Sequence, residues 1–567
     1  MSSTAEPLQE QAPPNRSVES PYDSAAPSAD IILRSSDLIN FYVLKAFLSY
    51  VSPFFKDMFA LPSTTTNEIM DGFPVIAVAE TSETIRLLLD LIYPHVDKPQ
   101  IDDVALFLNV CKATRKYCID MIENRLRIQI VSSHLTVSEP LRVYAVAIDL
   151  GWEDVALIAA RNASKISLDK LPRAQELQNI SGSGFFRFLD YKLRCDKLPF
   201  VDTLKAFPLS ASVTSAPTLT GNVFTARPNV HTLLSLRRAQ AQKQFGETTK
   251  ADVILRSKDL VNFYVLEDVV RTASHSSSSS DTPFPFGIAN GETSANGLAI
   301  INVAEDSEVL RHLLSFIYHI SDGFDNLTCR LCIQVVLAAR RYGITIIETR
   351  FRKQAAASPL MSMEPLWMYI VASALGWAEL TKSAAINTLS SPLQNMVYTD
   401  NLNLITGADL YRLVSFRFRC ADAACEVVND NAKYRAHGPG KWALAYEDKT
   451  YQTRLTHHCP ADELIEKLKS CPRGSTIKKA YDLEDQGLSW LPLSSPTSTL
   501  DGPEFIKIWE CRREIESVVE AAVAMVPFHV CVSQWFLTSL TRLRWTWPAD
   551  NIIWKYCWRR QCTCHIS

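Results

Sequence analysis

The sequence lacks a charge excess of either sign, an apolar leader and a dense cysteine framework. Its 58 basic and 61 acidic residues leave a net charge of -3, so the chain as a whole has no field that would gather nucleic acid or an anionic membrane. Residues 1–20 contain no apolar core of the signal-peptide kind, and the 14 cysteines are scattered over 567 residues. We therefore expect an intracellular protein, in the cytoplasm or the nucleus.

Catalytic and nucleotide-binding motifs are also lacking. No nucleophile, general base and oxyanion donor occur together in a recognisable spacing. Gly438–Lys441 lacks both the spacer and the trailing hydroxyl residue of a P-loop, and Gly182 and Gly184 are better interpreted as a loop or helix cap than as a phosphate cradle. We predict that the protein is not an enzyme and has no catalytic residue and no cofactor.

No group of cysteines and histidines has the spacing of a standard metal site. Cys329 and Cys332 form a C-x-x-C pair, but the matching positions of the internal repeat described below are Val104 and Phe107, which favours packing in a core. Four potential zinc ligands near the end of the sequence lack the spacing of a zinc knuckle, namely Cys557, Cys562, Cys564 and His565. We predict no metal site.

What the sequence does contain is an internal duplication. Residues 29–44 (ADIILRSSDLINFYVL) and 251–266 (ADVILRSKDLVNFYVL) are identical at 13 of 16 positions, with an offset of 222. The offset then becomes 225, as in Glu139-Pro140-Leu141 against Glu364-Pro365-Leu366, and stays there. A period this long indicates duplicated domains rather than a solenoid. We call residues 29–200 the first copy and residues 251–420 the second copy.

Each copy is expected to form a small sheet followed by helices. In the first copy, residues 31–33 and 40–43 are typical of a β-hairpin and residues 75–78 of a buried strand. Apolar residues at spacings of three and four predict helices after Leu44 and from residue 134 to about residue 200. The predicted fold class is α+β and predominantly helical.

Local start and stop signals divide the predicted helices. Ser52-Pro53 is expected to end one helix and begin the next, because proline is tolerated in the first turn of a helix and not in its interior. Gly151 and Gly376 lie where a left-handed cap would end a helix, at matching positions of the two copies.

These patterns predict eight segments. They are a disordered tail (1–28), a first sheet-and-helix domain (29–130) with its helical extension (131–200), a linker with a helix (201–250), a second such domain (251–355) with a disordered loop (274–297) and its extension (356–420), a loosely organised C-terminal helical region (421–528), and a tail of anomalous composition (529–567).

The first copy resembles a BTB (POZ) domain. The resemblance lies in the strand pair around Asp30–Leu33 and Phe41–Leu44, in the segment Ser52–Phe59 with its Ser-x-x-Phe-x-x-Met-Phe pattern, and in the strand and helix of residues 75–93. Residues 134–200 are similar to the helical extension that often follows such a domain. The second copy resembles the family more weakly, and the resemblance as a whole implies a tandem of BTB-like domains.

The resemblance implies a role in protein interaction. Such domains dimerise, and in several families they bring a substrate to a cullin ubiquitin ligase or recruit transcriptional partners. We expect the partner-binding residues of the first copy to be Phe54, Phe55, Met58 and Phe59, as partly core and partly contact residues. The second copy has a serine-rich stretch in place of that segment and is expected to have lost the surface.

These inferences predict a protein-interaction adaptor or scaffold that binds protein partners, a cullin among the candidates, and forms an intramolecular pseudo-dimer or a homodimer. The alternative is a transcription- or chromatin-associated scaffold in which the basic residues Arg237, Arg238 and Lys243 make weak DNA contacts. Residues 521–537 carry no formal charge, but Pro527 and several polar residues of this segment argue against a membrane anchor.

The last 39 residues hold five of the 11 tryptophans and four of the 14 cysteines. We leave open whether residues 529–567 are native or result from an error in the predicted coding sequence.

Overall fold

The structure is a computed structural model. It describes residues 16–17, 21–23, 26, 28–61, 68–93, 99–195, 245–246, 250–274, 286, 297–320, 327–430, 461–480 and 516–528. The chain divides into two compact units: Met1–Ile180 with Arg187–Ala211, and Ser181–Phe186 with Ser212–Ser567. Each unit is described by itself.

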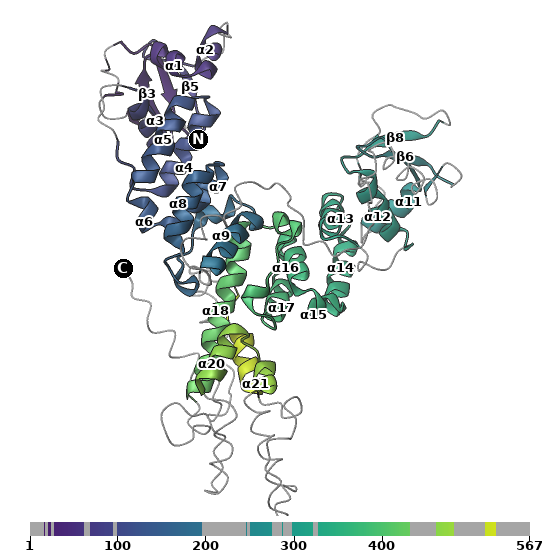
Figure 1. The fold of residues 1–567 in the computed structure, drawn as a ribbon. Helices are drawn as coiled ribbons and strands as arrows, with labels where there is room; N and C mark the ends of the chain where they lie inside the picture. The colour runs from purple at the N-terminus through teal and green to yellow at the C-terminus, as the bar shows by residue number, and fades with distance from the viewer. Residues whose placement is uncertain are drawn as a thin grey trace, which may run out of the picture. The chain divides into compact units, whose positions relative to one another are not determined.

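The first unit begins with a small mixed sheet, at the top of Figure 1. Its strands are ordered β1-β3-β2-β5-β4, and the predicted hairpin is present because β2 and β3 pair antiparallel. β5 lies parallel to β2, on the side away from β3. The strands are β1 (Arg16–Ser17), β2 (Ile31–Arg34), β3 (Ile39–Val43), β4 (Ile69–Met70) and β5 (Phe73–Ala77).

Helices make up most of the first unit. Five of them, α1 to α5, surround or follow the sheet, and the remaining ones form the extension below it in Figure 1. Their bounds are α1 (Lys45–Val51), α2 (Pro53–Ala60), α3 (Ser82–Ile92), α4 (Val104–Lys116), α5 (Asp120–Ser132), α6 (Leu135–Ser138), α7 (Pro140–Asp149), α8 (Glu153–Ala163), η1 (Leu168–Lys170), η2 (Gln175–Gln178) and α9 (Gly182–Cys195).

The predicted start and stop signals are confirmed. Ser52 ends α1 and caps α2, where its side chain accepts a hydrogen bond from the amide of Phe55 at 3.1 Å and Pro53 occupies the first helical position. Gly151 and Gly376 have φ angles of +68° and +70°, in the left-handed region that a side chain with a Cβ rarely adopts.

The described part of the second unit has a similar order of elements, without counterparts of β1, α2 and β4. Its sheet is ordered β7-β6-β8, with β6 antiparallel to β7 and parallel to β8. The elements are β6 (Val253–Arg256), β7 (Asn262–Val265), α11 (Glu267–Ser274), β8 (Ala299–Asn302), α12 (Ser307–Ile317), α13 (Cys329–Arg341), α14 (Thr345–Ala357), α15 (Leu360–Met363), α16 (Pro365–Ala374), α17 (Ala378–Thr388), η4 (Leu393–Asn395), η5 (Asp400–Leu404) and α18 (Gly407–Asp430).

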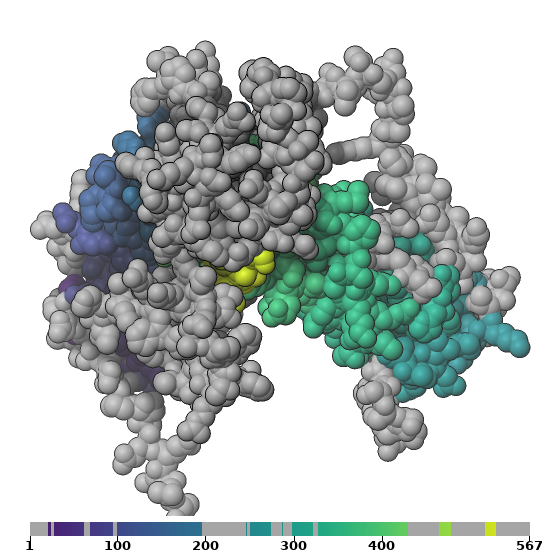
Figure 2. Space-filling view, turned by 90° about the horizontal axis from the view of Figure 1, so that it is seen from below, coloured from purple at the N-terminus to yellow at the C-terminus, as the bar shows by residue number. Residues whose placement is uncertain are grey.

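Segments after the second copy pack on this unit. α20 (Ala461–Ser470) packs on α18, and α21 (Gly474–Ala480) packs on α20. A further helix at residues 516–525 belongs to the same region, and Figure 2 shows yellow atoms of this part of the chain next to green ones. Lys382 donates a hydrogen bond to the carbonyl of Ala524 at 2.7 Å, and Phe528 contacts the Phe416 ring with the ring centroids 5.1 Å apart. The described parts of residues 421–528 are therefore helical and packed.

The structure confirms an α+β, predominantly helical fold and corrects the predicted tail of residues 1–28. Tyr22 is buried, and its hydroxyl donates to Asp90 at 3.0 Å while its ring meets Tyr93 edge-on. Phe245 has the same role in the second unit, beside Phe263 and Tyr318. In each unit, an aromatic residue that precedes the first repeated strand packs beside the sheet. Composition alone does not predict this packing.

Candidate protein-interaction site

The four predicted partner-binding residues lie on α2, and the structure places them in different environments. Phe55 is 2% exposed and belongs to the core, whereas Phe54 is 41% exposed. Met58 and Phe59 are half-buried. Tyr50 on α1 and Leu61 after α2 are exposed apolar residues on the same pair of helices. We define the α1–α2 surface as Tyr50, Phe54, Met58, Phe59 and Leu61.

Aromatic stacking fixes α2 on the body of the first unit. The Phe55 ring stacks on Tyr117, which follows α4, with a centroid distance of 4.8 Å, and Phe59 stacks on Phe55 at 5.9 Å. Ser52 adds a polar anchor, because its hydroxyl donates to the carbonyl of Tyr117 at 2.5 Å. Phe54 is thus held by a rigid helix while its ring remains accessible.

Tyr117 is held in turn by a half-buried carboxylate, that of Glu80. Its hydroxyl donates to Glu80, and Lys116 donates to the other oxygen of Glu80 at 2.8 Å. Burial acts to raise the pKa of Glu80, but the hydrogen bonds from Lys116 and Tyr117 outweigh it, so this pKa lies below its usual value. Burial and the Glu80 charge both raise the pKa of Tyr117. The pair is therefore a fixed carboxylate with a neutral tyrosine donor.

The second copy keeps this pair and replaces its stacking partner. Glu305 accepts hydrogen bonds from Tyr342 and Arg341, at positions 225 beyond Glu80, Tyr117 and Lys116. Phe286 is buried and lies against Tyr342 with a centroid distance of 4.2 Å, as Phe55 lies against Tyr117.

This contact corrects the predicted loop of residues 274–297, which was expected to bury no apolar side chain. Ser274 is the last residue of α11. Phe286 is part of the core, because its ring packs against Tyr342. Residues 275–285 and 287–296 lie outside the described residues. The repeat alignment missed Phe286, and the only available signal was a pair of phenylalanines, Phe284 and Phe286, in a polar stretch.

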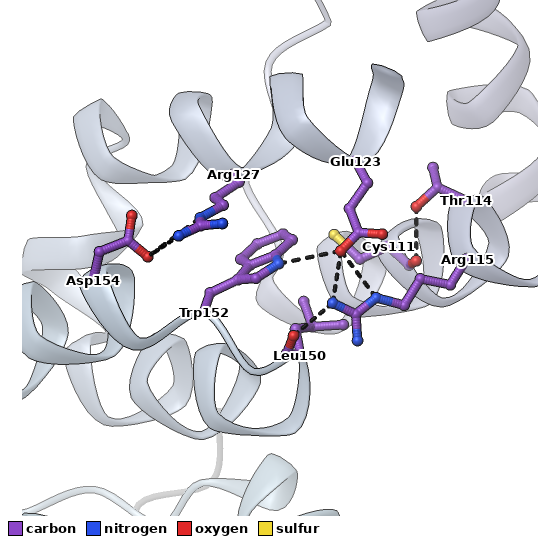
Figure 3. A network of polar contacts seen from close by, with 8 residues as sticks. All are labelled: Cys111, Thr114, Arg115, Glu123, Arg127, Leu150, Trp152 and Asp154. Atoms are coloured by element: carbon purple, nitrogen blue, oxygen red, sulfur yellow. Dashed lines mark hydrogen bonds and ion pairs between the residues drawn. The ribbon is translucent and has the colours of Figure 1, made fainter. Parts of the chain in front are cut away.

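A second polar network joins the helical extension to the preceding helices. Arg115 on α4 donates to Glu123 on α5 at 2.6 Å and to the carbonyl of Leu150, the residue that ends α7, at 2.5 Å. The indole N–H of Trp152 donates to the same Glu123 oxygen at 3.2 Å (Figure 3). The hydrogen bond to Glu123 raises the pKa of Arg115 against the effect of burial. One carboxylate and one guanidinium thus connect α4, α5 and the α7–α8 turn.

The second unit contains the same network, displaced by 225 residues. Arg340 donates to Glu348 at 2.6 Å and to the carbonyl of Leu375 at 2.6 Å, and Trp377 donates to Glu348 at 2.8 Å. Arg352 is a third residue that donates to Glu348, at 3.1 Å. The hydrogen bond from Arg340 is the main reason that the pKa of Glu348 is lowered to about 2.

The remaining candidate residues have other places. Cys329 and Cys332 are buried on α13, where burial raises the pKa of each thiol to about 12, as expected of core residues. Gly182 begins α9. The predicted zinc ligands, the basic residues Arg237, Arg238 and Lys243, and the segment Gly438–Lys441 all lie outside the described residues.

Within the described residues, no three His, Cys, Asp or Glu side chains gather as a possible metal site. None of the described helices has the length and apolar composition needed to cross a bilayer.

Comparison with known proteins bears on the first copy. No curated protein matches the chain. Strands β2 to β5, with their hairpin, and the helices α1 to α5 coincide with the part of the chain that matches a family model. Residues 24–133 match the BTB/POZ domain, a module of protein–protein interaction.

Proposed function

We propose that the protein is a non-enzymatic adaptor that binds protein partners through the α1–α2 surface of its BTB domain. The observation that carries this proposal is the contrast between adjacent residues: Phe55 is buried in the aromatic stack, while Phe54 is 41% exposed on the same rigid helix. Aromatic residues held rigidly at a surface are typical anchors of protein interfaces, because binding them costs little conformational entropy.

The test compares the proteins captured by the intact chain with those captured by Phe54→Ala. We expect the variant to retain its fold, because the Phe54 ring is 41% exposed and its loss removes only its contacts with Tyr117 and Phe55, at 5.6 and 5.5 Å. Capture should fall by about tenfold or more, as for a hot-spot residue. Quantitative mass spectrometry after affinity purification measures the capture.

Two variants make the result specific. Met121→Ala changes a residue that is 62% exposed on α5, outside the α1–α2 surface, and should leave capture unchanged. Phe55→Ala should destabilise the domain by about 3–5 kcal/mol, as expected for loss of a buried aromatic ring. An identical set of partners for Phe54→Ala and the unaltered chain would contradict the proposal.

A cullin is the partner class that the BTB domain favours, and binding of a purified cullin to the intact chain and to Phe54→Ala is the direct assay. The alternative, a scaffold of a transcription complex, rests on basic residues outside the described part of the chain. It predicts DNA binding that weakens steeply with salt, because phosphate contacts release counterions.

We further propose that the second copy is a divergent BTB domain and that the two copies form a pseudo-dimer within one chain. The support is the shared sequence register: the hairpin, the Glu–Tyr pair and the Arg–Glu–Trp network recur at constant offsets. The α1 position is kept as α11, whereas no described helix of the second copy corresponds to α2.

A further inference from the structure

Residues 516–528 form an amphipathic helix that is followed by a proline and an aromatic residue. One face of the helix is buried, with residues at spacings of four and three: Val519, Val523 and Val526. Phe528 is buried as well, whereas Met525 on the other face is 59% exposed. A helix that docks into a groove of another protein has this pattern of apolar anchors.

The second unit holds the C-terminal end of this helix by its backbone. Lys382 on α17 donates to the carbonyl of Ala524 at 2.7 Å, and Arg419 on α18 donates to the carbonyl of Pro527 at 2.6 Å. Cations are favourable here, because the last turn of a helix leaves its carbonyls without partners inside the helix and carries the negative end of its dipole. Both contacts lie at the surface, where they contribute little, so the buried side chains carry most of the binding.

Phe528 anchors the end of the segment. Its ring is 3% exposed and packs edge-on against Phe416 on α18 and Tyr369 on α16, with centroid distances of 5.1 and 6.1 Å. A single aromatic ring that enters a buried aromatic environment is typical of a binding hot spot.

The start of α21 holds the first half of the helix. Glu520 accepts hydrogen bonds from Arg473 at 2.9 Å and from the amide of Gly474 at 3.0 Å. A Cβ at Gly474 would collide with the backbone of Glu516 and would lie 2.8 Å from Glu520 Cγ. The close approach of this helix to α21 therefore requires a glycine at position 474.

The first copy differs at the positions that hold this segment. Arg194 occupies the place of Arg419 at an offset of 225, and it pairs with Asp190 of its own helix at 2.7 Å. The second copy has Ser415 in place of Asp190, and Lys382 in place of a leucine. An ion pair within one helix is thus replaced by two cations that face the end of another helix.

We infer that the second unit carries a docking site for an amphipathic helix that ends in Pro-Phe, and that residues 516–528 occupy this site reversibly. Any helix of this kind offers the same backbone carbonyls, so specificity lies in the buried face and in the aromatic residue. A partner helix with this pattern gains access when the chain's own segment leaves. The site lies in the second copy and is independent of the α1–α2 surface proposed above.

Hydrogen exchange of the unaltered full chain tests whether the segment leaves by itself. We expect residues 516–525 to exchange at least tenfold faster than α16 and α18, because release of a docked segment is a local opening. Protection equal to that of α16 and α18 would show that the segment is an integral part of the core, and would overturn the inference.

Fluorescence anisotropy tests the site with a labelled peptide of residues 516–528. Glu520→Arg in the full chain sets two cations against each other at Arg473 and should release the chain's own segment. This variant should bind the peptide at least tenfold more tightly than the unaltered chain, whose site is filled. A peptide with alanine in place of Phe528 should bind at least tenfold more weakly.

Two further variants make the result specific. Glu466→Arg reverses the charge of an exposed glutamate on α20 outside the segment, and should bind the peptide no better than the unaltered chain. Gly474→Ala added to Glu520→Arg should abolish peptide binding, because the new Cβ meets the helix backbone, although alanine favours α21 itself.

Thermal unfolding of Glu520→Arg completes the test. We expect the second unit to unfold cooperatively, as in the unaltered chain. Loss of that cooperative transition, absence of peptide binding, or binding that the Phe528 and Gly474 changes leave unaltered would each contradict a reversible docking site.

Discussion

At the scale of single residues, each copy uses one half-buried carboxylate to join segments that are distant in the sequence. Glu123 and Glu348 each accept from an arginine eight residues before and a tryptophan 29 residues after. The constant offset of 225 predicts that these positions match, as it does for Gly151 and Gly376. The interaction itself was not predictable, because the spacings belong to no local rule of helix or turn.

Glu348→Gln should destabilise the second unit by about 1–3 kcal/mol at pH 7, since donors that face the carboxylate lose a charged partner. The pKa of Glu348 is lowered from 4.5 to about 2 by folding, so its contribution is present above about pH 4.5 and is lost as the pH falls towards 2. The apparent Tm of the variant should therefore lie below that of the unaltered protein at pH 7 and approach it at low pH. Calorimetric scans across this range measure the difference.

Glu466→Gln is the control for this series. Glu466 pairs with Lys469 at an exposed position on α20, where an ion pair contributes little. Its Tm should be unchanged at every pH. A constant Tm difference for Glu348→Gln from pH 7 to pH 2 would show that the stabilisation does not depend on the carboxylate charge.

At the scale of elements, local rules predicted more than composition did. The hairpin, the break at Ser52-Pro53 and the left-handed glycines follow from turn and capping chemistry within a few residues, and all are present. Tyr22, Phe245 and Phe286 were not predicted as core residues, because each lies in a polar segment without a helical or strand periodicity. Tertiary packing decides whether these residues are buried, and the periodicity of the sequence carries no information about it.

Ser52→Ala should loosen α2 in particular. The hydroxyl caps the helix at Phe55 and donates to Tyr117, so its loss removes two hydrogen bonds and should cost about 1–2 kcal/mol. Hydrogen exchange should show the first loss of protection in α2. Thr81→Ala is the comparison, because the Thr81 side chain makes no capping bond to α3, and a loss of equal size in α3 would contradict this account.

At the scale of the whole molecule, only the match to a BTB/POZ domain over residues 24–133 identifies a known module. The roles of Phe54, Met58 and Phe59 as contacts remain predictions, as do the linker helix and the character of residues 529–567, which lie outside the described residues. Contact roles depend on the partner protein, and the structure of the remaining segments depends on contacts with residues distant in the sequence. A local sequence pattern carries little information about either.

The proposed pseudo-dimer makes one prediction for the intact chain. If the two copies use each other's dimerisation surfaces, residues 25–430 should be monomeric in solution, because no such surface is left for a second chain. Multi-angle light scattering over a range of concentrations measures the mass. An obligate dimer with separate copies would contradict the pairing and leave the α1–α2 surface proposal untouched.

The hydrogen bond from Arg115 to the carbonyl of Leu150 bears on how this chain transmits force and where it can be cut. The side chain that satisfies the C-terminal end of α7 belongs to α4, inside the BTB domain. Residue 130 therefore marks a change in the sequence pattern, but a hydrogen bond joins the segments on its two sides. Force applied to the extension would act directly on the BTB domain. A fragment that ends at residue 133 would lack α7, so the Arg115 guanidinium would lose its hydrogen bond to the Leu150 carbonyl.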